Sequence, residues 1–242
     1  MRRLHRNSVL YVHRVDGPID IYRGHDDGVD QHIWKISQEF ADKTIFQSQY
    51  SLEKHLELGM KFKNPVIALN AADSAIFNPI NRLPFTPDRK TRLIASSWSD
   101  NPNKGAAVYA WLDDHLDWKR FEFVFIGRSP IRFHNIKMVD PMPSNKLADY
   151  LRQNDIYLTA SQNDPCSNSL IEALSCGIPA LYLKSGGHPE IVKNAGLGFN
   201  TPEEIPALLD QVINAYATYQ SNIDIPTLQS ITSFYLQTLE LV

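Results

Sequence analysis

Short apolar runs alternate with segments of helical periodicity along most of the chain, and this alternation limits the possible folds more than any other feature. Several runs are nearly continuous in β-branched or aromatic residues, as is typical of strands buried in a parallel sheet. Between them, residues 30–41, 105–116 and 144–154 place apolar side chains at helical spacing. We therefore predict an α/β fold with parallel sheets. The predicted strands are residues 8–15, 43–48, 65–70, 92–98, 121–127, 136–140, 156–161 and 179–185.

One segment interrupts the alternation. The stretch FNPINRLPFTPDRKT at 77–91 contains three prolines and no hydrophobic period, so we interpret it as an interdomain linker. The part after the linker has the full strand–helix series of a Rossmann-like domain, whereas the part before it has only about three strands. The predicted division is an incomplete N-terminal α/β portion at 1–78, a linker at 79–91, a Rossmann-like domain at 92–225 and a C-terminal helix within 226–242.

The composition excludes several classes of function. The net charge of −3 provides no field that would attract nucleic acid, and no apolar run approaches the ~20 residues of a membrane span. The sequence also lacks the pattern of a secretory signal. Its two cysteines, Cys166 and Cys176, do not have metal-ligand spacing and are expected to be reduced thiols. We therefore expect a cytoplasmic protein without a metal site.

Polar loops follow the predicted strands of the second part, and ligands in open α/β sheets bind at the carboxyl ends of strands. Lys104 comes just before a predicted helix, where its charge would add to the positive end of the helix dipole and suit phosphate oxygens. A solvated loop lysine is the alternative. The stretch SGGHPE at 185–190 could likewise present backbone amides to an anion or form a tight turn before a helix at Pro189.

Two carboxylates stand out in the stretch NDPCSNSLIEALSCGIP at 163–179. Ser169 and Glu172 fit the S-x-x-E capping box, and Asp164 before Pro165 fits an ordinary turn. Yet the strand at 156–161 delivers Asp164 at its carboxyl end, and we expect Glu172 in the first turn of the helix that begins there. Both carboxylates can then face one crevice, where they would suit the vicinal hydroxyls of a sugar or ribose.

These motifs together carry a family resemblance. The acid at 164, seven residues, then Glu172, Ala173, Gly177 and Pro179, resemble the signature of retaining glycosyltransferases with the GT-B fold, glycosyltransferase family 4. The stretches LYVHRVDGP (10–18), ADKTIFQSQYSLEKHLELG (41–59) and GGHPEIV (186–192) are similar to other parts of that family. The resemblance implies two Rossmann-like domains and a final helix that packs back towards the N-terminal portion.

The resemblance also implies roles for individual residues. Glu172 would hold ribose hydroxyls, Asp164 sugar hydroxyls and Lys104 the diphosphate, and His13 would lie near the reacting centre. The implied catalytic residues are His13, Lys104, Asp164 and Glu172, and the implied substrate-binding residues are Ser97, Ser99, Lys104, Gly127, Pro141, Met142, Asp164, Asn168, Ser169, Leu170 and Glu172.

The implied function is transfer of a sugar, with retention, from a nucleotide-diphosphate sugar to a hydroxyl of a glycan or lipid-linked acceptor in cell-surface glycan synthesis. The donor is a substrate, and neither cofactor nor metal is expected. Peripheral contact with the inner face of the membrane is compatible with such an acceptor.

The sequence departs from the family in two places. Ser99 stands where the family usually has an arginine, and Ser96, Ser97 or Arg128 are candidates to compensate. The Gly-rich loop and the strands that usually precede VHRVDG are also missing. A truncated or split protein, which binds a nucleotide sugar but needs a partner chain or dimer to cover its incomplete sheet, is therefore an alternative. A GT-B-like epimerase or hydrolase is a third possibility. Such an enzyme would be expected to have additional acids or histidines in the loops that bind the donor, and His188 is the only histidine there.

Overall fold

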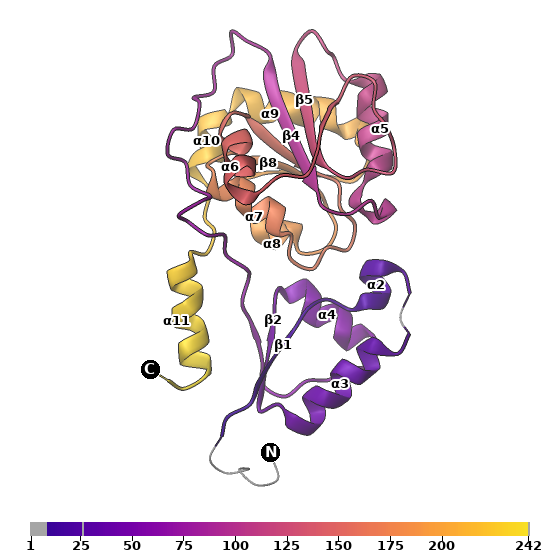
Figure 1. Ribbon diagram of the computed structural model, residues 1–242, viewed down its shortest axis with the longest axis vertical. Coiled ribbons are helices and arrows are strands. Elements are labelled where there is room, and N and C mark those ends of the chain that lie inside the picture. Colours follow the sequence, from indigo (N-terminus) through magenta and orange to yellow (C-terminus); the bar gives the residue numbers. More distant parts are fainter. Residues whose placement is uncertain (1–8, 26, 242) are drawn as a thin grey trace.

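The computed structural model describes residues 9–25 and 27–241, arranged as two lobes that meet at a narrow waist (Figure 1). The smaller lobe contains a three-stranded parallel sheet, and the larger lobe a six-stranded parallel sheet. The predicted α/β class is therefore confirmed, with one Rossmann-like sheet and one short sheet. No helix among the described residues combines the length and apolar character needed to cross a bilayer.

The N-terminal lobe contains too little apolar material for a large core. Its sheet has the order β1-β2-β3, and one small cluster joins Val15 and Phe46 of the sheet to Leu52 of a neighbouring helix. The predicted strand at 8–15 is shorter in the structure, and its first residue lies outside the described residues. The elements are β1 (Val12–Val15), α2 (Ile19–Arg23), α3 (Val29–Phe40), β2 (Lys43–Phe46), α4 (Gln49–Glu57) and β3 (Pro65–Ile67).

The C-terminal lobe has the predicted series of alternating strands and helices. Its strands are β4 (Thr91–Ser97), β5 (Phe121–Gly127), β6 (Lys137–Val139), β7 (Ile156–Thr159), β8 (Ala180–Leu183) and β9 (Gly196–Phe199). The helices between them are η1 (Pro102–Lys104), α5 (Ala106–His115), α6 (Ser144–Arg152), α7 (Asn168–Ser175), α8 (His188–Val192), η2 (Pro202–Glu204), α9 (Ile205–Asn214) and α10 (Tyr216–Ser221). Strand β9 was not predicted, because the sequence GLGF contains no apolar run.

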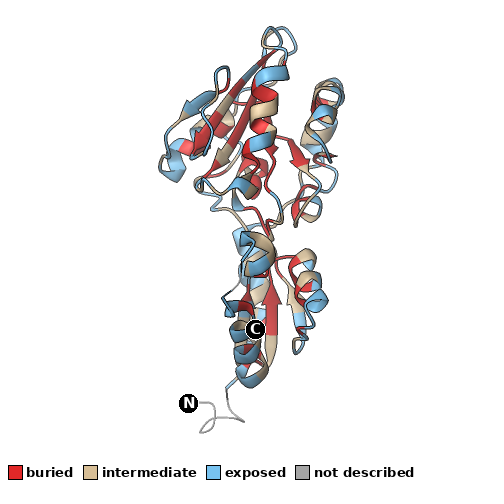
Figure 2. Ribbon diagram, turned by 90° about the vertical axis from the view of Figure 1, so that its right-hand side faces the viewer, coloured by how far each residue is buried: buried red, intermediate tan, exposed pale blue. Residues whose placement is uncertain are grey.

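The large sheet is covered on both faces, which is why its strands are apolar almost throughout. Successive residues of β4 point to opposite faces: Leu93 and Ala95 join one core cluster and Ile94 the other. Helices α6 and α7 supply apolar side chains to the cluster with Ile94, and helices α5 and α9 to the cluster with Leu93. Figure 2 shows that most buried residues lie in this lobe.

Residues 68–90, all of them described, connect β3 to β4 without a helix or strand. After α10 the chain returns to the N-terminal lobe as α11 (Leu228–Thr238), which runs beside the small sheet (Figure 1). The contact is partly ionic, because the Lys43 ammonium donates to the Thr238 carbonyl at 3.0 Å and to the Glu240 carboxylate at 2.9 Å. Helix α11 therefore follows the C-terminal lobe in the sequence but contacts the N-terminal lobe.

Candidate functional site

The strand order of the large sheet explains where its polar loops meet. The order β6-β5-β4-β7-β8-β9 places β4 in the middle, with the chain running outwards first on one side and then on the other. The loops after β4 and β7 consequently diverge around a crevice at the carboxyl ends of the strands, the usual ligand position in such sheets. These loops carry Lys104 and Asp164, which lie 60 positions apart in the sequence.

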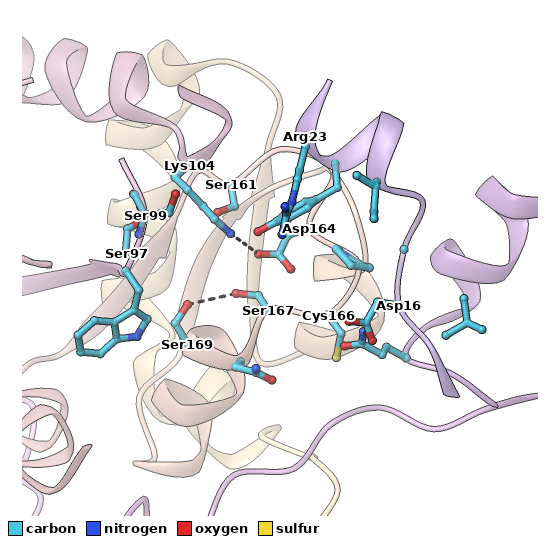
Figure 3. A pocket seen from close by; sticks show the side chains of 18 of the residues that line it. Asp16, Arg23, Ser97, Ser99, Lys104, Ser161, Asp164, Cys166, Ser167 and Ser169 are labelled. Carbon is cyan, nitrogen blue, oxygen red and sulfur yellow. Dashed lines mark hydrogen bonds and ion pairs between the residues drawn. The ribbon is translucent and has the colours of Figure 1, made fainter. Parts of the chain in front are cut away.

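A cavity of about 690 Å³ lies between the two lobes at this edge of the sheet (Figure 3). Such a volume is within the range of small-molecule sites. Eight of the residues that were predicted for the site line this cavity: His13, Ser97, Ser99, Lys104, Asp164, Asn168, Ser169 and Glu172.

Lys104 and Asp164 form an ion pair at the centre of the cavity wall, with Lys104 Nζ 2.9 Å from Asp164 Oδ2. Lys104 ends the short helix η1, and α5 begins at Ala106 after Gly105, which has a φ of 86°. Burial opposes the charge of Lys104, but Asp164 and Tyr22 outweigh it and raise the pKa of the ammonium. The pair therefore presents one positive and one negative group, suited to phosphate oxygens and to hydroxyls respectively.

Helix α7 begins two residues earlier than the capping box predicted. Its N-cap is Ser167 and its first residue is Asn168, so Glu172 lies in the second turn. The capping box of Ser169 and Glu172 is wrong, because no side chain caps this helix. The backbone amides at its start are thus left without a side-chain cap, beside Ser167, Asn168 and Ser169 on the cavity wall.

The carboxyl group of Glu172 has no hydrogen bond or ion pair to any side chain or backbone group in the described ranges. Burial alone raises its pKa to about 7. A buried carboxylate of this kind is poorly solvated when the cavity holds no ligand. It would gain hydrogen bonds from a ligand that brings hydroxyl groups to the cavity.

His13 enters the cavity wall from β1 of the opposite lobe. Its Nδ1 lies 2.6 Å from the Ser37 hydroxyl, which fixes the ring and leaves Nε2 outside that contact. Burial lowers the pKa of this histidine, so the imidazole is mostly neutral at neutral pH. The N-terminal lobe therefore supplies a neutral polar ring to a cavity whose ion pair comes from the other lobe.

Four predicted residues do not line the cavity. Gly127 ends β5 with a φ of 117°, and a Cβ there would lie 1.8 Å from the Ser97 carbonyl oxygen, which explains the glycine by packing. The Leu170 side chain is fully buried in the core, and Met142 packs partly against the same core. Pro141 is exposed in the loop after β6.

Two of the three residues proposed to compensate for Ser99 do reach the cavity. Ser96 and Ser97 line it, whereas Arg128 does not. Ser99 itself is held in a local turn, where its carbonyl accepts from the Ser97 hydroxyl at 2.7 Å and its hydroxyl accepts from the Asn101 amide at 3.1 Å. None of these serines replaces the charge of an arginine.

Sequence reasoning missed the contribution of α2. Tyr22 and Arg23 line the cavity, and the Lys104 ammonium lies 5.0 Å from the centre of the Tyr22 ring. The carbonyls of Ile21 and Tyr22 accept from the side chains of Asn163 and Asn103. The only signal in the sequence was that this helix follows the carboxyl end of a strand.

Further contacts join the two lobes through residues that do not line the cavity. The Glu190 carboxylate accepts from the backbone amides of Gln49 and Tyr50, both at 2.7 Å, and so caps α4 from the opposite lobe. The Tyr50 hydroxyl also donates to the Asn163 side chain at 3.0 Å. Among residues 9–25 and 27–241, no group of three or more His, Cys, Asp or Glu side chains is arranged to hold a metal ion.

Comparison with known proteins gives a consistent result. Residues 133–222 match the family described as Glycosyl transferases group 1. The phosphatidylinositol N-acetylglucosaminyltransferase GPI3 subunit of Saccharomyces cerevisiae strain YJM789 is 30% identical over 145 residues, which are 52% of this chain and 31% of that protein. The chain therefore spans less than a third of this relative.

Solved structures share the fold over nearly the whole chain. HepE of Anabaena in complex with UDP and glucose superposes with a TM-score of 0.75 at 16% identity, covering 96% of this chain and 72% of HepE. Sucrose-phosphate synthase of Thermosynechococcus elongatus gives a TM-score of 0.72 at 15% identity, covering 99% of this chain and 71% of the synthase. Residues 133–222 are thus similar to the group 1 glycosyl transferases, and the chain has a GT-B-like fold built from a six-stranded C-terminal sheet and a three-stranded N-terminal sheet.

Proposed function

We propose that this chain binds a nucleotide-diphosphate sugar in the cavity between its lobes and transfers the sugar, with retention, to a hydroxyl acceptor. The observation that carries the proposal is the convergence of Lys104, Asp164, Glu172 and the uncapped start of α7 on one cavity. Cationic and amide donors suit the diphosphate, and the two carboxyl groups suit hydroxyls of the sugar and ribose. HepE, which has the same fold, was crystallised with UDP-glucose.

In this proposal the side chains act by position and charge. Lys104 and the amides of α7 stabilise negative charge on the departing diphosphate, and Asp164 and Glu172 fix the hydroxyls of the donor. His13 approaches the sugar from the acceptor side. The acceptor would be a glycan or lipid-linked hydroxyl, and an enzyme that uses a lipid-linked acceptor would work at the inner face of the membrane.

A thermal-shift screen against UDP-, GDP- and ADP-sugars tests the donor. A ligand at 100 times its dissociation constant adds ~2.7 kcal/mol to the stability of the folded state. We expect one donor class to raise the melting temperature of the unaltered chain, and Glu172→Ala to abolish most of that rise because the ribose hydroxyls lose their acceptor. Glu203→Ala is the matched control, since Glu203 lies in η2 away from the cavity. Unchanged donor binding by Glu172→Ala contradicts the assignment.

The short N-terminal sheet favours a second candidate, a nucleotide-sugar-binding protein that catalyses transfer only with a partner chain. The sheet has three strands, β1 pairs only with β2 among the described residues, and the match covers 72% of HepE. Assays of donor hydrolysis and sugar transfer by the isolated chain separate the two candidates. Steady turnover by a monomer supports the enzyme, whereas donor binding without turnover supports the second candidate.

A further inference from the structure

The charged side chains around the cavity are unevenly paired. Arg14, Arg23 and Lys104 are the arginine and lysine residues that line it. The Lys104 ammonium is occupied by Asp164, and the Arg14 guanidinium by Asp16 and Asn70, each at 2.9 Å. Within the described part of the chain, Arg23 forms neither an ion pair nor a side-chain hydrogen bond. An incoming anion can therefore bind Arg23 without first breaking an existing contact.

The position of Arg23 is fixed by the helix that carries it. The buried Asp30 carboxylate accepts from the amides of Ile19 and Asp20 at 2.9 and 3.1 Å, and so anchors the first turn of α2. The other end of α2 is held against the donor loops by Asn103 and Asn163. Figure 3 shows Arg23 descending from this helix towards the Lys104–Asp164 pair. Its guanidinium thus faces the cavity from the lobe opposite to Lys104.

A nucleoside diphosphate carries more negative charge than the Lys104–Asp164 pair can offset, because Asp164 already balances the ammonium. An unpaired guanidinium on the facing wall supplies the missing charge and can bind phosphate oxygens with two parallel hydrogen bonds. We propose that Arg23 is a second cation for the donor diphosphate, supplied by the N-terminal lobe. The inference rests on the proposed function, and it makes tight donor binding depend on both lobes.

Calorimetry with UDP, GDP and ADP and with the matching free nucleosides tests this inference. Using the diphosphate that the unaltered chain binds most tightly, we expect Arg23→Ala to weaken affinity about tenfold, the usual cost of one charge-assisted contact. The affinity for the free nucleoside should not change, because it has no phosphate. The diphosphate affinity of Arg23→Lys should lie between those of the unaltered chain and Arg23→Ala, since lysine keeps the charge but loses the planar fork of the guanidinium.

Two further variants make the test specific. Arg128→Ala removes an exposed arginine that does not line the cavity, and it should bind the diphosphate like the unaltered chain. Ser99→Arg, added to Arg23→Ala, places a guanidinium on the cavity wall from the other lobe and should restore most of the lost affinity. Arg23→Ala should also keep its melting temperature, because Arg23 is exposed and has no side-chain partners in the described residues.

The outcomes separate this inference from the function on which it rests. If the unaltered chain binds none of the three diphosphates, the proposed function fails and the role of Arg23 fails with it. If the unaltered chain binds one of them and Arg23→Ala binds it equally well, only the role of Arg23 is overturned. Equal losses of diphosphate and nucleoside affinity likewise overturn it, because they indicate a general disturbance of the cavity.

Discussion

Lys104 Nζ and Asp164 Oδ2 lie 2.9 Å apart and join the loop after β4 to the loop after β7 across the crevice of the large sheet. Both side chains are mostly buried, with exposed fractions of 20% and 11%. A pair in this setting differs from a surface salt bridge, because removing one partner leaves the other charge poorly solvated.

We expect Asp164→Asn to lower the free energy of unfolding by about 2 kcal/mol, since it leaves the Lys104 ammonium without its counter-charge. Urea denaturation of the ligand-free protein measures this effect. Glu57→Gln is the control, because its partner Lys54 forms an exposed pair that should contribute less than about 0.5 kcal/mol. Equal effects of the two variants would show that the Lys104–Asp164 pair contributes no more to stability than an exposed ion pair.

The raised pKa of Glu172 predicts a pH dependence of stability. Below its ordinary value of 4.5 the carboxyl group is protonated in both the folded and unfolded states, so it has no effect. Between 4.5 and about 7 the folded state binds more protons than the unfolded state, so stability falls as pH rises. Above about 7 both states are ionised and the full penalty remains, at most about 3 kcal/mol.

Glu172→Gln removes this titration, so we expect its stability to fall less than that of the unaltered chain between pH 5 and pH 8. At pH 8 the variant should be the more stable protein. Chemical denaturation at several pH values measures the difference. Parallel pH profiles for the two proteins would contradict the raised pKa.

Gly127→Ala should destabilise the C-terminal lobe by about 3 kcal/mol or more. Its φ is 117°, and a Cβ would lie 1.8 Å from the Ser97 carbonyl oxygen, so both the conformation and the close approach require glycine. Gly24→Ala is the matched control: its φ is 78°, but no atom lies within 4 Å of the added carbon. This control should lose only about 1 kcal/mol. Thermal unfolding measures the loss of stability in both variants. The difference between the two losses is the cost of the close contact with the Ser97 carbonyl, over and above the cost of the positive φ.

Glu190→Ala should loosen the junction of the lobes. Two amides at the start of α4 lose their acceptor, which costs about 1–2 kcal/mol. Small-angle X-ray scattering should then report a larger radius of gyration, because the lobes separate more readily. Glu53→Ala serves as the control, since the Glu53 carboxylate accepts from the Gln49 side chain within α4 itself. A radius unchanged from that of the unaltered chain would show that other contacts hold the lobes together.

Much of the candidate site was accessible from the sequence because its parts are local motifs. The spacing of Asp164 and Glu172, the lysine before a helix and the strand-end position of each loop are all written in short stretches of sequence. Eight predicted residues accordingly line one cavity. The errors arose where neighbouring atoms decide the outcome. The cap of α7 moved to Ser167, and Gly127 is explained by the Ser97 carbonyl that lies beside it.

The sequence by itself determined the α/β class, the strand-rich core and most strand positions, because apolar periodicity follows directly from which faces are buried. It did not reveal β9, whose two glycines pack closely against β8 without forming an apolar run. Only the tertiary structure brought α2 onto the loops after β4 and β7, through hydrogen bonds between residues some 80 and 140 positions apart. Contacts over such distances depend on how two lobes fit together, and no local pattern in the chain encodes that fit.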